Sequence, residues 1–402
     1  MTFLNDLFGR RRRAPEIPPE IPETKESASR ALIALTGAGR PQWTPRAYEA
    51  LAREGFARNA VAYRCIRMIA EAAASVPLRV DVNGRHDPTH PLAQLMERPN
   101  GEQGGADLRE ALYASLQTAG NAYLEAAERP DGQRELWALR PERVKVVPNA
   151  RGWPDAYDYG VDGRSVRIGR DNEGWLKVLH LKQWHPLDDW YGFSPLEAAA
   201  FAIDVHNASG AWNKALLDHS ARPSGALIYG GKGSERLTED QFERLKAQLD
   251  DTHTGTDNAG RPLLLEGGLD WKPMSLSPSE MDFIAGKHAA AREIALAFGI
   301  PAQLLGIPGD NSYANYREAN AAFWRHTVLP LVERTTRGLS NWLAAKYPQA
   351  RLVPELDALP ALSVEREALW ARLNAAAFVS EAEKRRLAGL SAAEKPEGRA
   401  DD

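Results

Sequence analysis

Four side chains in one short stretch could carry acid–base or metal chemistry. His180, His185, Asp188 and Asp189 combine imidazole and carboxylate groups, which act as general acids and bases and as zinc ligands. Their spacing fixes no geometry, because the stretch lacks the HExxH pattern that places two histidines on one helix face. A hydrolase-type enzyme with a cleft built on these four residues is therefore kept as an alternative hypothesis.

The segment from Gly225 to Ser234 approaches the phosphate-binding pattern GxxxxGKS or GxxxxGKT. Lys232 stands one residue late, Gly233 follows it, and the intervening Ala-Leu-Ile-Tyr favours a strand. Phosphate binding by this motif needs a loop of free amides that opens onto a helix. We therefore interpret the segment as a strand and turn, and we predict no nucleotide site.

The other chemical candidates are isolated residues. His86 and His90 are four residues apart, but Pro88 between them argues against the shared helix face of a zinc-binding pair. Cys65 is the one cysteine, which excludes an intramolecular disulfide and a multi-thiolate zinc site. No GxSxG nucleophile motif occurs. The sequence predicts no metal or cofactor site and, on balance, no catalytic activity.

Length and charge narrow the function further. The 402 residues are 43% hydrophobic and 26% charged, as in a soluble globular protein of about two to four domains. Fifty Lys and Arg against 54 Asp and Glu give a net charge of -4, so the protein is not expected to bind nucleic acid tightly by neutralising many phosphates. No apolar run reaches the roughly 18 residues of a membrane helix, and no secretory signal is recognisable, so we expect no membrane association.

The chain is predicted to begin with a Pro-rich arm, which an α+β region follows. Residues 1–40 are predicted to form a disordered arm, because prolines between residues 14 and 26 prevent helix and sheet. An amphipathic helix is predicted over 59–75, with Cys65 on its apolar face, and a second helix over 108–116 that ends near Gly120. Short strands are predicted at 78–82, 122–127, 137–140, 144–147 and 176–181.

The second half reads as two long helices on either side of a small insert. Ser194 and Pro195 predict the start of a helix that runs to about 220, and another helix is predicted over 279–298. The insert should contain strands at 225–229 and 263–265 and a helix capped by Thr238. The last elements are a helix over 313–345 kinked at Pro330, an extended stretch at 351–353 and one helix over 364–390.

Short motifs follow one another in a specific order between about residues 58 and 345. Each motif alone is weak, whereas the order of so many is hard to obtain by chance. They are Asn59-Ala-Val-x-x-x-Cys65-Ile with Pro77, His90-Pro-Leu with Pro99-Asn100, Gly120-Asn-Ala-Tyr123, Leu139-x-Pro, Tyr191-Gly-Phe-Ser-Pro-Leu196, Pro223-Ser-Gly225, Phe298-Gly-Ile-Pro301 with Leu304-Leu-Gly306, and Asn311-Ser-x-x-Asn315 before Phe323 and Pro330.

In this order the motifs resemble the portal proteins of long-tailed double-stranded-DNA phages and gene transfer agents. The resemblance implies a subunit with an α/β wing, a two-helix stem, a small α/β clip, a long kinked helix with a tunnel loop, and a short helical crown. The implied boundaries are wing 41–195, stem 196–220 and 279–300, clip 221–278, tunnel-loop region 301–316, the long helix and strand of the wing 317–362, and crown and tail 363–402. The resemblance is weakest at 377–383, in the crown.

The same resemblance implies the partners. About twelve copies would form a ring at a capsid vertex of the virion, assembled in the bacterial cytoplasm. The ring would contact the major capsid protein, the terminase motor and a head-to-tail adaptor, and double-stranded DNA would pass through it. A monomeric adaptor or scaffold protein remains a further alternative.

The resemblance also implies where DNA and partners would be contacted. The channel residues would be Lys287, Arg292 and the tunnel-loop tip Asp310, Asn311, Ser312 and Tyr313, and the clip interface would include Arg261, Trp271 and Lys272. Residues 196–300 contain ten Lys and Arg against fifteen Asp and Glu, a net charge of -5. Repeated around a ring, this charge would make a weakly repelling wall, which suits a sliding polyanion.

Overall fold

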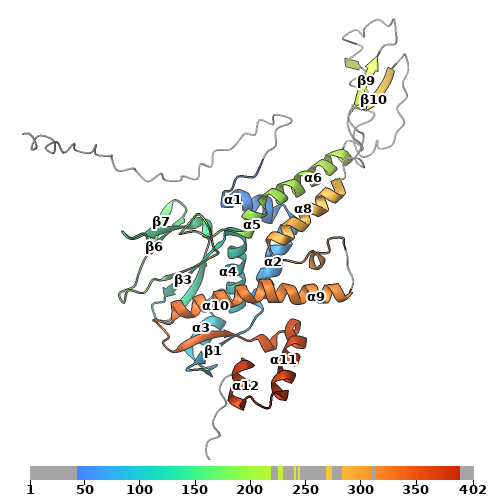
Figure 1. Cartoon of the computed structure of the whole chain (residues 1–402). Helices are drawn as coiled ribbons and strands as arrows, with labels where there is room; N and C mark the ends of the chain where they lie inside the picture. Colours follow the sequence, from blue (N-terminus) through green and yellow to red (C-terminus); the bar gives the residue numbers. More distant parts are fainter. Residues whose placement is uncertain are drawn as a thin grey trace, which may run out of the picture. The chain divides into compact units, whose positions relative to one another are not determined.

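The α+β class predicted from the sequence is confirmed. The computed structural model describes residues 43–218, 225–229, 240, 243–244, 269–273, 283–309 and 313–389 (Figure 1). The predicted arm of residues 1–40 and the insert elements at 238 and 263–265 lie outside the described residues. Within these, no group of three or more His, Cys, Asp or Glu could hold a metal ion, and no helix is long and apolar enough to cross a membrane.

Two packed helices form the centre of the fold. Helix α2 (Ala60–Ala74) begins where Asn59 Oδ1 accepts hydrogen bonds from the Val61 and Ala62 N–H groups at 3.1 and 3.0 Å. It packs on α4 (Gly105–Ala119), which starts three residues before the predicted helix and ends at Gly120 with φ +70°. The face of α2 with Cys65, Ile66 and Ile69 is completely buried, as its 3.6-residue periodicity predicts.

The chain after α4 forms an antiparallel sheet over this helix. Strand β3 (Asn121–Glu128) lies between β4 (Arg134–Leu139) and β8 (Val178–Lys182). In this register Tyr123 stands opposite Leu139 on one side and His180 on the other. The sheet thereby places His180 against Tyr123, where it is partly buried.

A second antiparallel sheet includes a hairpin that the sequence analysis did not predict. Strand β5 (Val144–Pro148) pairs with β6 (Pro154–Val161), which pairs with β7 (Arg164–Ile168). Asp162 and Gly163 connect β6 and β7 with φ +48° and +76°. An Asp-Gly pair with both φ values positive is the usual two-residue hairpin turn, so this turn was the available signal.

A third sheet joins segments from the two ends of the described chain. Strand β1 (Leu78–Val82) pairs antiparallel with β11 (Ala350–Pro354) and with the short β2 (Arg85–His86). The predicted strand at 78–82 and the extended stretch at 351–353 are confirmed. Helix α10 (Leu329–Leu343) packs on β11.

Helices α6 (Ala200–Asp218) and α8 (Phe283–Ala297) lie side by side (Figure 1). Ser194 caps the short helix α5 (Pro195–Ala198) before α6, as predicted, through a 2.9 Å bond from the Glu197 N–H. A break at Ala199 separates α5 from α6, so the predicted single helix is two helices. In the insert, β9 (Gly225–Tyr229) confirms the predicted strand and pairs with β10 (Leu269–Pro273).

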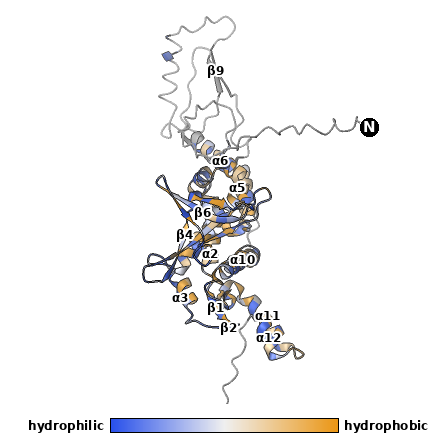
Figure 2. Cartoon of the chain, turned by 90° about the vertical axis from the view of Figure 1, so that its left-hand side faces the viewer, coloured by the Kyte–Doolittle hydropathy of each residue, from blue (hydrophilic) through white to orange (hydrophobic). Residues whose placement is uncertain are grey.

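The long helical segment around Pro330 is not one α-helix. Helix α9 (Tyr313–Phe323) passes through the π-helical segment η5 (Trp324–Val328) into α10. The Leu329 N–H donates to Trp324 O, five residues earlier. The wider π turn stands directly before Pro330, whose ring and missing N–H disturb a regular α-helix at this position. The buried residues of α10 lie on one face of the helix and are Val332, Thr335, Thr336, Leu339 and Leu343. In Figure 2, which looks nearly along α10, the loops that project from the body beside β4 and β6 are mostly hydrophilic.

The prediction of one helix over 364–390 is wrong. Helix α11 (Ser363–Ala375) and helix α12 (Glu381–Leu387) are separated by residues 376–380. Ser380 ends the break because its hydroxyl caps α12 while Glu383 bonds back to the Ser380 N–H at 3.2 Å. This Ser-x-x-Glu capping box was a readable signal for a new helix start.

Short elements complete the fold. They are α1 (Tyr48–Leu51), the π-helical η1 (Ala52–Ala57), α3 (Pro91–Glu97), and the 3-10 turns η2 (Pro141–Arg143), η4 (Ala302–Leu305), η6 (Leu356–Ala358) and η7 (Pro360–Leu362). His90, one of the two histidines considered as a zinc-binding pair, caps α3 by accepting from the Leu92 N–H at 3.1 Å.

Candidate functional site

His180 lies in an aromatic pocket of the body and not in an open cleft. Its ring stacks on Tyr123 with centroids 4.3 Å apart and meets Tyr157 edge-on at 5.8 Å. Its Nε2 lies 2.9 Å from Asn121 Oδ1. Burial lowers the pKa of His180 to about 3, with a smaller contribution from Lys182, so the imidazole is neutral at physiological pH.

The other members of the His/Asp group hold the loop that follows β8. His185 Nδ1 accepts from the Leu187 N–H at 3.0 Å, and Asp188 Oδ1 accepts from the Trp190 and Tyr191 N–H groups at 2.7 and 2.9 Å. Asp189 contributes its backbone carbonyl to the Lys182 ammonium. The structure thus assigns all four residues local structural contacts and does not converge their side chains on one cavity.

Asn121 connects this loop to the central helix. Its Oδ1 accepts from the Gly192 N–H at 2.7 Å, and its Nδ2 donates to Ala119 O at 2.8 Å. Gly120 and Gly192 touch so closely that a Cβ on Gly192 would lie 2.1 Å from Gly120 O. Gly120 and Asn121 belong to one of the short motifs and Gly192 to another, so two sequence motifs meet at one contact.

Cys65 is inert in this fold. Its side chain is fully buried on α2, and burial raises the pKa of the thiol to about 12. Because the thiolate is the reactive form, the position fits a small core residue and not a nucleophile.

Lys287 and Arg292 both lie on α8 but in different surroundings. The Lys287 ammonium faces α6, 4.0 Å from the place that a Cβ on Gly210 would occupy, and its charge helps to lower the pKa of His206, after the larger effect of burial. Arg292 donates to Pro308 O. Arg292 therefore fixes the loop that leads from η4 towards α9, a contact that was not predicted.

Gly309 lies beside this contact. A Cβ on Gly309 would lie 2.4 Å from an Arg292 guanidinium nitrogen, so a larger residue at 309 would require the end of the Arg292 side chain to shift. Asp310, Asn311 and Ser312, the predicted tip of this loop, lie outside the described residues. Tyr313 is the first residue of α9.

The predicted interface residues of the insert are partly described. Trp271 and Lys272 belong to β10, opposite Leu227 and Ala226 of β9, while Arg261 lies outside the described residues. The structure thus places two of the three on one strand.

A polar contact between α6 and the start of α2 was missed by the sequence analysis. Buried Asn59 donates to Asn207 Oδ1 at 2.9 Å and lies 3.1 Å from His206 Nδ1. Asn207 in turn donates to Glu54 O at 3.0 Å. Asn59 was readable as a helix cap, but nothing in the sequence showed that its amide also holds α6.

An exposed aromatic surface near β6 and β8 was also missed. Trp153, Trp184, Leu187 and Trp190 are 71%, 80%, 91% and 39% exposed. The Trp190 indole donates to Gly152 O at 3.1 Å, which brings the two loops together. Clustered apolar side chains at a surface are typical of protein contacts.

Comparison with known proteins gives consistent matches. The family model described as phage portal protein matches residues 60–389. A protein of Rickettsia bellii is 42% identical over 343 residues, which cover 84% of this chain and 88% of that protein. The portal protein of Enterobacteria phage HK97 is 25% identical over 74% of this chain and 70% of its own length.

Solved structures match over most of the chain. A chain in the neck of a native gene transfer agent particle, computed with C12 symmetry, is 52% identical with a TM-score of 0.66. The match covers 89% of this chain and 97% of that chain. A portal protein of the HK97 family from Corynebacterium diphtheriae, 16% identical with a TM-score of 0.56 over 80% of this chain and 100% of its own, shares the fold.

Proposed function

Because the chain belongs to the phage portal family, we propose that about twelve copies close into a ring at one capsid vertex of a tailed phage or gene transfer agent. The ring forms the channel for DNA packaging and release and the connection between head and tail. The observation that carries this proposal is the 52% identity, over 89% of the chain, to a protein of a particle neck with C12 symmetry.

In this proposal α6 and α8 are the stem that borders the channel. Residues 196–300 carry a net charge of -5, which the ring multiplies into a weakly repelling wall for DNA. Arg292 is held by Pro308 O, so its contribution is to position the tunnel loop, whereas Lys287 remains the candidate for phosphate contact. Few cationic contacts allow DNA to slide instead of being trapped.

The ends of the channel meet other components. The insert with β9 and β10 is the clip, where Arg261, Trp271 and Lys272 would contact the terminase motor and later the head-to-tail adaptor. The wing would contact the major capsid protein, and the exposed side chains around Trp184 suit such a contact. The tunnel-loop tip, Asp310 to Tyr313, would follow the moving DNA.

The portal itself carries no catalytic activity in this proposal, and a separate ATPase supplies the force. The residues that motivated the enzyme hypothesis make structural contacts instead. His185 and Asp188 accept hydrogen bonds from backbone N–H groups, and His180 packs on Tyr123 and bonds to Asn121. Replacement of His185 and Asp188 by Ala should therefore change stability and not turnover of a substrate.

The test is the mass and shape of the purified full-length protein. Light scattering on a sizing column should give a mass of about twelve times 44.3 kDa, and negative-stain images should show rings with a central hole. If the purified protein remained monomeric even in the presence of its capsid protein, this would contradict the ring and favour the hypothesis of a monomeric adaptor.

A further inference from the structure

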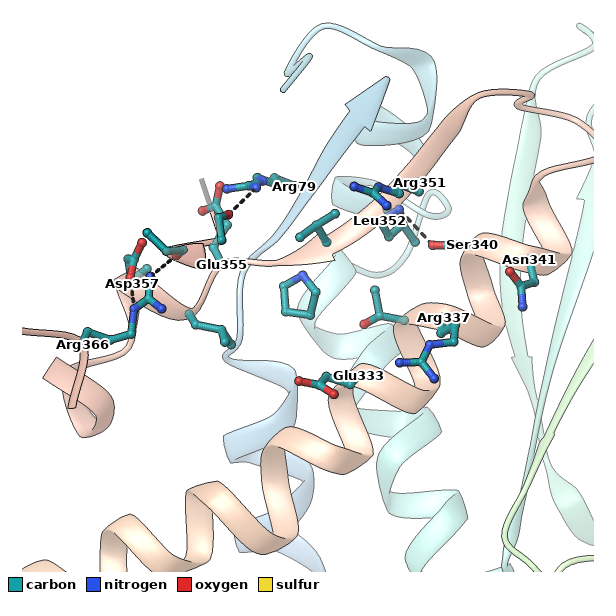
Figure 3. Close-up of a pocket in the computed structure, with 17 residues that line it drawn as sticks. Arg79, Glu333, Arg337, Ser340, Asn341, Arg351, Leu352, Glu355, Asp357 and Arg366 are labelled. Atoms are coloured by element: carbon teal, nitrogen blue, oxygen red, sulfur yellow. Dashed lines mark hydrogen bonds and ion pairs between the residues drawn. The ribbon is translucent and has the colours of Figure 1, made fainter. Parts of the chain in front are cut away.

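A charged cleft opens between α10, β11 and the C-terminal helices. Its volume is about 890 Å³, within the range of sites that hold a ligand or a short peptide segment. One wall is the polar face of α10, and the other is the end of β11 with the turn that follows (Figure 3). Pro354, Leu356 and Ala358 contribute apolar surface.

Some charges around this cleft are paired within the chain. Arg79 pairs with Asp81 at 3.1 Å and donates to Gly389 O at 3.1 Å. Arg366 pairs with Asp357 and donates to Ala388 O at 2.7 Å. These contacts close one end of the cleft and fix the chain just after α12.

Four other charges have no ion pair or hydrogen bond with any described residue. They are Glu333 and Arg337 on the α10 wall and Arg351 and Glu355 on the opposite wall (Figure 3). Glu333 and Glu355 lie towards one end of the cleft, and Arg337 and Arg351 towards the other. The unpaired charges are therefore acidic at one end of the cleft and cationic at the other, while Arg79 and Arg366 at the acidic end are paired.

Thr336 adds an independent sign of an absent partner. It lines the cleft, is only 2% exposed, and its Oγ1 has no hydrogen-bond partner in the described structure. A buried hydroxyl without a partner is unfavourable, and a bound segment with a polar group that reached it would remove this cost.

The strand edge beside the cleft is closed to strand addition. The Leu352 N–H already donates to Ser340 Oγ at 2.9 Å, and Pro354 has no N–H. An occupant must therefore be recognised through its side chains. It needs an apolar group for the surface of Pro354, Leu356 and Ala358, and both an acidic and a basic group for the unpaired charges.

The chain itself presents such a segment in the turn between α11 and α12. Phe378 is 92% exposed there, the most exposed large hydrophobic side chain in the described part of the chain. The first turn of α12 brings Glu381 and Glu383, and its last turn Lys384, Arg385 and Arg386. We call residues 376–386 the C-terminal tip. Because Phe378 is exposed, the tip does not occupy the cleft of its own chain.

We propose that the cleft receives the C-terminal tip of a second copy of this chain. Phe378 then covers the apolar surface of the cleft, Glu381 meets Arg337 and Arg351, and Arg386 meets Glu333 and Glu355. This contact rests on the proposed ring, since cleft and tip are different surfaces and such contacts repeat around a closed assembly.

Cysteine cross-linking tests the contact directly, because buried Cys65 leaves a low background. We expect the double variant Ala377→Cys with Ala358→Cys, which keeps Phe378 and is oxidised as assembled rings, to give a ladder of covalent oligomers on a non-reducing gel. The matched control Ala377→Cys with Trp153→Cys should give none, since Trp153 is also exposed but belongs to the loop between β5 and β6.

The outcomes separate the contact from the ring. Rings that show no ladder, or only an intramolecular link, would overturn the contact and leave the ring intact. The absence of rings in light scattering of the wild-type protein would overturn both. As a second measurement, Arg337→Glu should lower the fraction of assembled rings about fivefold, and Glu381→Arg in the same chain should restore it. No restoration would contradict the proposed pairing.

Discussion

Two regions use polar residues in opposite ways. One is the set of contacts around Asn121, His180, Asp188 and Gly192, which we call the junction, and the other is the cleft beside α10. At the junction, Asn121, His180 and Asp188 bond to groups of the same chain, and aromatic rings pack on His180. In the cleft, charged side chains such as Arg337 and Glu355 lie on opposite walls and have no ion-pair partners in the described structure. Polar residues that look catalytic in the sequence thus stabilise the subunit, whereas ordinary surface charges are available to a partner.

The strongest test of this contrast is Gly192→Ala at the junction. A Cβ there would lie 2.1 Å from Gly120 O and 2.7 Å from the Gln183 N, and backbone atoms cannot move aside cheaply. We expect a loss of about 3–5 kcal/mol in the free energy of unfolding, measured by urea denaturation. Gly101→Ala is the control, since no atom lies within 4 Å of its Cβ, and an equal loss there would contradict the argument.

Asn121→Ala should have the next largest effect. It removes the acceptor of the buried Gly192 N–H and of His180 and leaves both without that partner. The expected loss is about 2–4 kcal/mol in the same measurement. A loss below about 0.5 kcal/mol would mean that water replaces the amide and that the junction is not a closed network.

The pH dependence of stability sharpens the role of His180. Its pKa is about 3 in the folded protein against 6.5 ordinarily, so between these values the unfolded chain binds more protons and stability falls as pH falls. The contribution is up to about 1.4 kcal/mol per pH unit. His180→Gln, which keeps a donor for Asn121, should show a smaller loss of stability between pH 7 and 5 than the wild type. Parallel curves for the two proteins would show that His180 is not the group responsible.

The smallest effect is expected for the cleft charges. Arg337→Ala and Arg351→Ala should each change the unfolding free energy of the isolated subunit by less than about 0.5 kcal/mol, because neither side chain has a described partner. Arg366→Ala is the matched comparison, since it breaks an ion pair and a bond to Ala388 O and should cost more. Equal losses of unfolding free energy for all three variants would show that the paired and the unpaired arginines contribute equally to stability.

The elements that the sequence predicted correctly have strong local signals. The cap at Asn59, the buried face of α2, the alternation in β1 and the apolar run of β9 specify their elements without help from the rest of the chain. The β6–β7 hairpin and the start of α12 also had local signals, the Asp162-Gly163 turn and the Ser380–Glu383 box, which were overlooked.

The site was harder to predict because its contacts are non-local. Arg292 reads as a surface cation until the fold brings Pro308 and Gly309 to it, and His180 reads as an acid–base group until the register of β3 and β8 places it against Tyr123. The spacing of residues along the chain predicts neither the contact of Arg292 with the loop nor the packing of His180 on Tyr123. The order of motifs carried the functional prediction, since it reflects the whole arrangement at once.

The pairing of β1 with β11 has a consequence for the order of events during synthesis. Val80 stands opposite Leu352, so the sheet cannot form until the ribosome has released about 350 residues of chain. Until then the edge of β1 that pairs with β11 is open, and α10 lacks the strand β11 on which it packs. Newly made subunits should therefore become competent to associate late and all at once, which keeps incomplete chains out of a growing particle.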